Sequence, residues 1–115
     1  MVLGFLSGLV MGLNFHRENW LGGYGSFKRR LYRLGHISFF GLAAANLMFY
    51  FTARFLLAPT PTVQIASWAF SIGAIFMPVC CLLTAHIASC RSLFAVPVIS
   101  LVLAGALTLW EVIKL

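Results

Sequence analysis

Acidic side chains are almost absent from this sequence. Glu18 and Glu111 are its two carboxylate side chains, and charged residues make up only 9% of the 115 residues. A water-soluble domain of average composition carries about 25% charged residues. The composition therefore excludes an ordinary soluble fold, and the apolar segments contain no pair of carboxylates for acid–base catalysis.

Sequence motifs of common enzyme classes are also missing. The glycine-rich stretch before Ser26 lacks the Gly-Lys-Ser or Gly-Lys-Thr ending of a phosphate-binding loop. The three cysteines, Cys80, Cys81 and Cys90, form no Cys-x-x-Cys pair. Cys80 and Cys81 stand inside an apolar run, where cysteine behaves as a small buried hydrophobic group. We therefore expect a protein that is not an enzyme.

Hydrophobic residues make up 62% of the chain and fall into four runs. A transmembrane helix needs about 20 mostly apolar residues. The sequence thus predicts an all-α integral membrane protein, a single transmembrane domain over residues 1–115 with about four helices in an antiparallel bundle. We place the helices at about residues 2–15, 36–57, 63–88 and 92–112. The first, at about 21 Å, is short for a full span.

The connection between the first two predicted helices carries most of the positive charge. Ser26 follows a glycine-rich turn and suits the capping position of a helix. Phe27, Leu31 and Leu34 then recur at helical spacing, which predicts a short interfacial helix with a basic opposite face. We expect its basic side chains to contact anionic lipid headgroups: Lys28, Arg29, Arg30 and Arg33.

The same charge predicts the orientation of the chain in the membrane. Residues 16–35 are strongly basic, residues 58–62 carry no charge, and residues 89–91 contain one arginine. Because cytoplasmic loops are enriched in Lys and Arg, we expect residues 16–35 in the cytoplasm of a bacterial-type cytoplasmic membrane and both termini on the opposite side. The net charge of +6 then indicates a lipid bilayer as partner, and no nucleic acid.

Small residues recur at four-residue spacing in the apolar runs. Gly4, Gly8 and Gly12 share one face of the first predicted helix, and Ala69 and Gly73 share one face of the third. Small residues let two helices approach closely in lipid. We expect these faces to pack against helices of this chain, of a second copy or of other membrane subunits.

Two prolines and one asparagine interrupt the apolar runs. Pro78 and Pro97 stand inside the third and fourth predicted helices, where each is expected to remove a backbone hydrogen bond and kink its helix. Asn46 stands deep in the second helix, and we expect its amide to bond across a helix interface.

Three histidines are predicted to lie near one level of the membrane. His36 and His86 are almost equally far along the chain from Thr60 in the uncharged turn, and His16 and His36 are equally far from Ser26. Ionisable groups at membrane depth are functional candidates, and two facing imidazoles can hold a haem iron. His36 and His86 are thus candidate ligands of a b-type haem, with His16 as a further candidate. The alternative is that all three are solvated interfacial groups.

The sequence is compatible with three functions. The first is a small non-enzymatic subunit, or an assembly or accessory factor, of a larger membrane complex, because the chain is nearly all helix with short connections. The second is an electron-transfer protein with haem b between His36 and His86. The third is a small transporter or channel component with Arg54 and Asn46 along its path.

Overall fold

The computed structural model describes residues 1–56 and 59–115. This part of the chain is all-α and contains no strand, in agreement with the predicted fold class. Three stretches are long and apolar enough to cross a membrane, namely Phe27–Phe55, Pro61–His86 and Ala88–Ile113. The elements are α1 (Val2–Asn14), the 3-10 helix η1 (Trp20–Gly22), α2 (Phe27–Phe55), α3 (Pro61–His86), the 3-10 helix η2 (Ala88–Phe94) and α4 (Ala95–Ile113).

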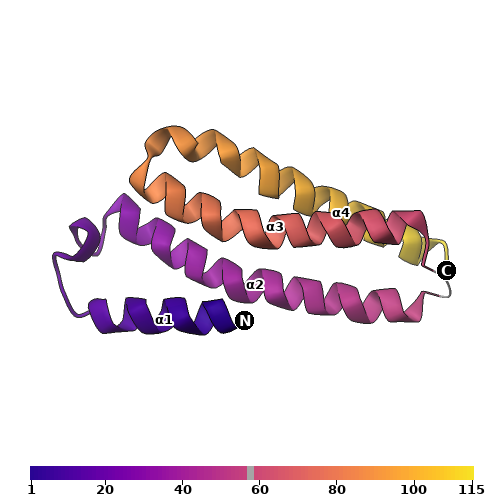
Figure 1. The fold of residues 1–115 in the computed structure, drawn as a ribbon, viewed down its shortest axis with the longest axis horizontal. Coiled ribbons are helices and arrows are strands. Elements are labelled where there is room, and N and C mark those ends of the chain that lie inside the picture. The colour runs from indigo at the N-terminus through magenta and orange to yellow at the C-terminus, as the bar shows by residue number, and fades with distance from the viewer. Residues whose placement is uncertain (57–58) are drawn as a thin grey trace.

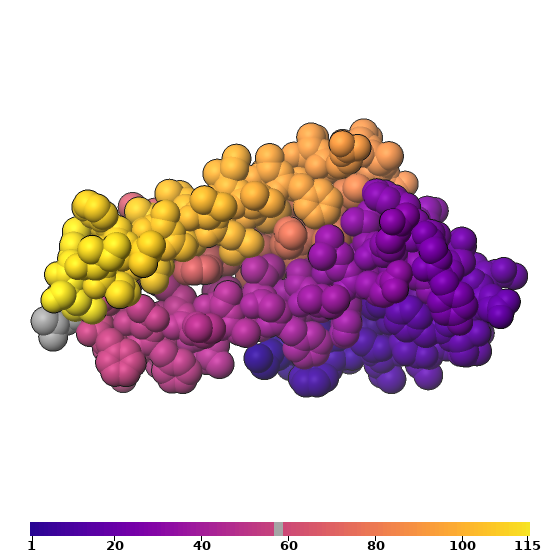
Figure 2. All heavy atoms as spheres, turned by 180° about the vertical axis from the view of Figure 1, so that it is seen from behind, coloured from indigo at the N-terminus to yellow at the C-terminus, as the bar shows by residue number. Residues whose placement is uncertain are grey.

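The helices lie side by side in chain order. Helix α1 packs on α2, α2 packs mainly on α3, and α3 packs on both α2 and α4. The Cα atoms span 53 × 28 × 16 Å (Figure 1). Seen from behind, α1 and α4 lie at opposite edges of the molecule (Figure 2). The described helices therefore form an open layer, and their all-α class and number agree with the prediction. The layer is open because the outer helices each pack on a single neighbour.

The two termini lie at different heights in this layer. The C-terminus is at the end opposite η1, whereas Met1 lies partway along α2, at a hollow shared with Leu42, Ala43 and Asn46 (Figure 1). Met1 stops short of the level of the C-terminus because the 13 residues of α1 reach only about 20 Å. That both termini lie on the membrane side opposite residues 16–35 stays a prediction.

Helix α2 begins where the sequence suggests and continues without a break. The Ser26 side chain accepts a hydrogen bond from the Arg29 backbone N–H at 3.2 Å, so the predicted cap is confirmed. The separate interfacial helix and the start of the next helix at His36 are wrong, because both belong to one 29-residue helix. Gly35 at the expected boundary is helical and packs against Cys81. The predicted end at Leu57 lies outside the described residues.

The ends of α3 and α4 also differ slightly from the prediction. Thr60 caps α3 by accepting a bond from the Val63 N–H at 3.3 Å, and Pro61 takes the first helical position, where it needs no donor. Pro78 lies inside α3 as expected. Pro97 instead lies in the first turn of α4, because η2 occupies residues that were expected to be helical. The expected loss of a hydrogen bond inside α4 is therefore wrong.

Small residues bring α3 and α4 together. Ala66, Ala69 and Gly73 are buried on α3, and the Ser100 hydroxyl of α4 donates to the Ala69 carbonyl at 2.6 Å. A Cβ added to Gly73 would overlap the Leu101 side chain. The predicted packing role of Ala69 and Gly73 thus corresponds to an interface within this chain.

The three glycines of α1 have different surroundings. A Cβ on Gly4 would lie 2.8 Å from the Phe40 ring, and one on Gly8 would lie 2.8 Å from Cε1 of His36. A Cβ on Gly12 would meet nothing within 4 Å. Gly4 and Gly8 therefore make room for two ring side chains of α2, whereas Gly12 has no packing role in the described contacts.

We predict opposite effects for two glycine-to-alanine substitutions. Gly73→Ala should lower the free energy of unfolding by about 1–3 kcal/mol, because Leu101 must move. Gly105→Ala should raise it by about 0.5–1 kcal/mol, because the helix gains propensity and nothing lies within 4 Å. Denaturation of the purified protein in detergent, followed by circular dichroism, measures both. Equal changes in the free energy of unfolding for the two variants would show that the α3–α4 contact tolerates a methyl group at Gly73.

Candidate functional site

Most of the basic residues lie at one end of the layer, called here the basic end. It contains the end of α1, η1, the start of α2, the end of α3, and η2 (Figure 1). Two clusters lie there: one surrounds the Arg29 guanidinium, and the other contains His36, His86 and their hydroxyl partners. Together they form the candidate functional site.

Arg29 is buried, with 0% of its surface exposed. Its guanidinium donates to the Phe15 carbonyl at 2.7 Å and to the Arg17 carbonyl at 3.5 Å. Phe15 ends α1, so the positive charge lies at the negative end of the helix dipole. Arg29 therefore differs from its predicted role as a headgroup contact, because its charge is used inside the protein.

Three aromatic rings surround this guanidinium. Its central carbon lies 4.0 Å from the centre of the Tyr24 ring, 4.9 Å from that of Phe15 and 5.4 Å from that of Trp20. The Tyr24 hydroxyl also donates to the Phe15 carbonyl, at 2.8 Å. Cations are attracted to the faces of such rings, most strongly when water is excluded. The cluster therefore fastens α1, η1 and α2 to one another.

The remaining basic residues of this helix face solvent or lipid. Lys28, Arg30 and Arg33 are all exposed, and Arg33 donates to the Tyr24 carbonyl at 3.3 Å. Their contact with anionic headgroups stays a prediction. At the other end, Arg54 is exposed near the end of α2. Asn46 donates to the Leu42 carbonyl of its own helix at 2.9 Å, so the expected bond across a helix interface is wrong.

His36 is oriented by α1. Its Nδ1 lies 2.9 Å from the Ser7 hydroxyl, and that hydroxyl also bonds the Gly4 carbonyl at 2.9 Å. The Ser7 hydroxyl therefore holds the His36 ring against α1 through Nδ1, and Nε2 is the second polar atom of that ring.

His86 is oriented by α2. Its Nε2 lies 2.7 Å from the Tyr32 hydroxyl, and the two rings meet edge to face with centres 5.8 Å apart. Tyr32 in turn packs edge to face on Trp20, which links this pair to the Arg29 cluster. His16 is exposed and makes no hydrogen bond with the rest of the described chain.

The haem interpretation gains no supporting observation from this geometry. His36 and His86 have separate hydroxyl partners, and binding of both Nε2 atoms to one iron would break the Tyr32–His86 bond. Within residues 1–56 and 59–115, no group of three or more His, Cys, Asp or Glu side chains could hold a metal ion. A haem between His36 and His86 therefore stays an untested prediction.

Sequence reasoning missed the partners that orient these groups. Ser7 and Tyr32 look unremarkable in the sequence, although Tyr32 precedes His36 by one helical turn and so shares its face. Both line a hollow of about 320 Å³ between α1 and α2 that also includes His36. Comparison of the chain with known protein families, with curated proteins and with solved structures finds no match.

We predict that Arg29→Gln releases α1. The shorter amide leaves the Phe15 carbonyl and the three rings without their cation, at a cost of about 2–3 kcal/mol. Hydrogen–deuterium exchange should then accelerate in residues 2–22 and stay unchanged in α3. Arg30→Gln is the matched control, since Arg30 is exposed on the same turn of α2. Unchanged exchange in α1 would contradict a fastening role for Arg29.

Proposed function

We propose that this protein is a small non-enzymatic subunit, or an assembly or accessory factor, of a larger membrane complex. The observation that carries the proposal is the exposure of two helix glycines on an open helical layer. A Cβ on Gly41 of α2 or on Gly105 of α4 would meet nothing within 4 Å. Both glycines therefore lie on helix surfaces where another helix could approach closely.

The apolar surface around these glycines supports the proposal. Ile37 and Met48, on the exposed side of α2, are 63% and 70% exposed, and Val102 of α4 is 66% exposed. Lipid alone can cover leucine and isoleucine, because it is equally apolar. A glycine in a lipid-facing helix costs about 1 kcal/mol relative to alanine, and close packing with a partner offsets that cost.

The proposal predicts a complex that depends on these two glycines. The protein released gently from its native membrane should migrate on a native gel well above its own mass of 12.7 kDa. Gly41→Leu and Gly105→Leu should dissociate that complex, because a branched side chain blocks close approach of a helix.

A matched control keeps this test specific. Ala106→Leu changes an exposed small residue of α4 about 100° around the helix from Gly105, and it should leave the complex intact if the glycine face is the contact. Each purified variant should also be at least as stable as the parent protein, because both glycines have open space above them and leucine has a higher helix propensity than glycine. A parent protein that migrates alone would refute the subunit proposal.

We further propose that the basic end faces the cytoplasm of a bacterial-type cytoplasmic membrane. Lys28, Arg30 and Arg33 are exposed there, and Arg91 in η2 is exposed on the neighbouring connection. Cytoplasmic connections of membrane proteins are enriched in Lys and Arg, and this enrichment supports the orientation.

The orientation predicts opposite labelling of two engineered cysteines. In a variant without the three native cysteines, Ser89→Cys in η2 should react only with a reagent that has entered the cytoplasm. Pro59→Cys should react with a membrane-impermeant reagent added outside intact cells. Both positions are exposed, so access across the membrane decides the result. The reverse pattern would invert the topology.

A further inference from the structure

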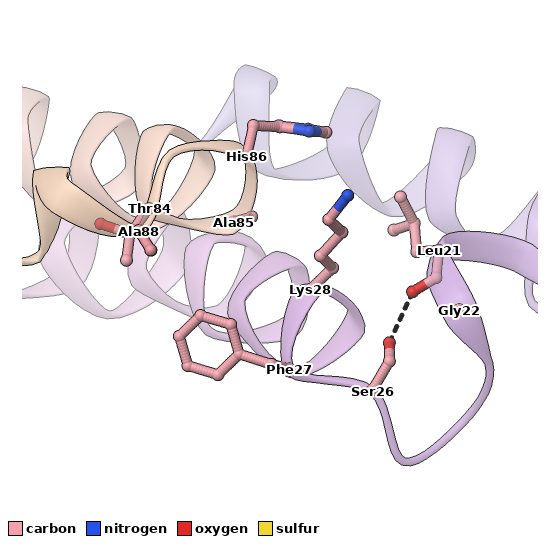
Figure 3. A pocket seen from close by; sticks show the side chains of 9 residues that line it. All are labelled: Leu21, Gly22, Ser26, Phe27, Lys28, Thr84, Ala85, His86 and Ala88. Carbon is pink, nitrogen blue, oxygen red and sulfur yellow. Dashed lines mark hydrogen bonds between the residues drawn. The ribbon is translucent and has the colours of Figure 1, made fainter.

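A hollow of about 560 Å³ opens at the basic end, between the start of α2 and the end of α3. Figure 3 shows the Lys28 amine directed from α2 toward the space beside the His86 ring of α3. Leu21 and Gly22 of η1 form the rim opposite α3. Three separate segments of the chain thus enclose one hollow with two basic side chains.

This hollow collects positive charge that no carboxylate neutralises. Neither acidic side chain lines it, and Glu111 instead pairs with Lys114 at 3.3 Å. The Phe27 and Lys28 backbone N–H groups, in the first turn of α2, have no partner among the described residues. The amino end of a 29-residue helix adds partial positive charge at the same place. The hollow therefore suits an anion.

The walls of the hollow are held in place by hydrogen bonds. The Tyr32 hydroxyl fixes the His86 ring through Nε2 at 2.7 Å, which leaves Nδ1 as the second polar atom of that ring. The Ser26 hydroxyl donates to the Leu21 carbonyl at 2.6 Å and so closes the rim (Figure 3). Thr84 lines the wall, but its oxygen points away from Lys28 in Figure 3, and we assign it no ligand contact.

We propose that this hollow binds a phosphate group, namely the phosphodiester of an anionic phospholipid. Helix amino ends and lysine amines are among the groups that bind phosphate oxygens in proteins. The lipid source follows from position, because Ser26 and His86 mark the ends of two stretches that are long enough to cross a membrane. Phe27, which is 53% exposed on the wall, offers apolar surface to an acyl chain. The inference does not depend on the proposed subunit role.

Native mass spectrometry of the protein released from detergent tests the proposal. The probes are phosphatidylglycerol, a diacylglycerol with the same acyl chains, and inorganic phosphate. One phosphatidylglycerol should stay bound, with the diacylglycerol and free phosphate at least about tenfold weaker. Lys28→Gln should weaken phosphatidylglycerol binding by about tenfold, and His86→Gln should weaken it less, because the α2 amino end and Lys28 remain.

Arg30→Gln is the matched control, since Arg30 is exposed two residues from Lys28 and does not line the hollow. It should leave the affinity within about twofold, as a surface charge contributes little. If Lys28→Gln and Arg30→Gln lost equal affinity for phosphatidylglycerol, the lipid would be held by diffuse attraction to the basic surface. That result would overturn the proposed site. Free phosphate that binds as tightly as the lipid would overturn the lipid source. No preference for phosphatidylglycerol over diacylglycerol would overturn the phosphate site itself.

Discussion

The arrangement of the basic end depends on the burial of the Arg29 guanidinium. A charge removed from water is costly unless the protein replaces its hydration. Here the replacement comes from the Phe15 carbonyl, at 2.7 Å, and from three ring faces. Because Arg29 belongs to α2 and Phe15 ends α1, the same bond fixes the position of one helix on the other. Gly8 then lies opposite His36, and Gly4 lies opposite Phe40.

Local sequence signals predicted much of the secondary structure. Ser26 and Thr60 stand at helix starts because their side chains bond backbone donors within three residues. The continuity of α2 through Gly35 was not predictable in this way, since its support comes from Cys81 on another helix. Spacing alone also groups Arg29 with the exposed Lys28 and Arg30, whereas its partner Phe15 lies 14 residues earlier in the chain.

For the histidines, too, the local sequence predicts some features, and the others depend on residues far along the chain. Counting residues from the turns predicts their approximate height, and the structure does place Tyr32, His36 and His86 at the same end. Their partners depend on how the helices are rotated about their axes. The rotation of each helix about its axis places Ser7 beside His36 and Tyr32 beside His86. No residue spacing in the sequence specifies that rotation. The same rotation leaves open space above Gly41 and Gly105.

The unbroken length of α2 has a mechanical consequence. Its 29 residues extend about 44 Å, whereas the hydrocarbon core of a bilayer is about 30 Å thick. A helix of this length that crosses a bilayer must project into the headgroup layer or tilt. In a continuous helix, hydrogen bonds along the backbone resist bending between the two ends. A tilt imposed at Lys28 would thus displace Phe55 as well, so that the two ends of α2 move together.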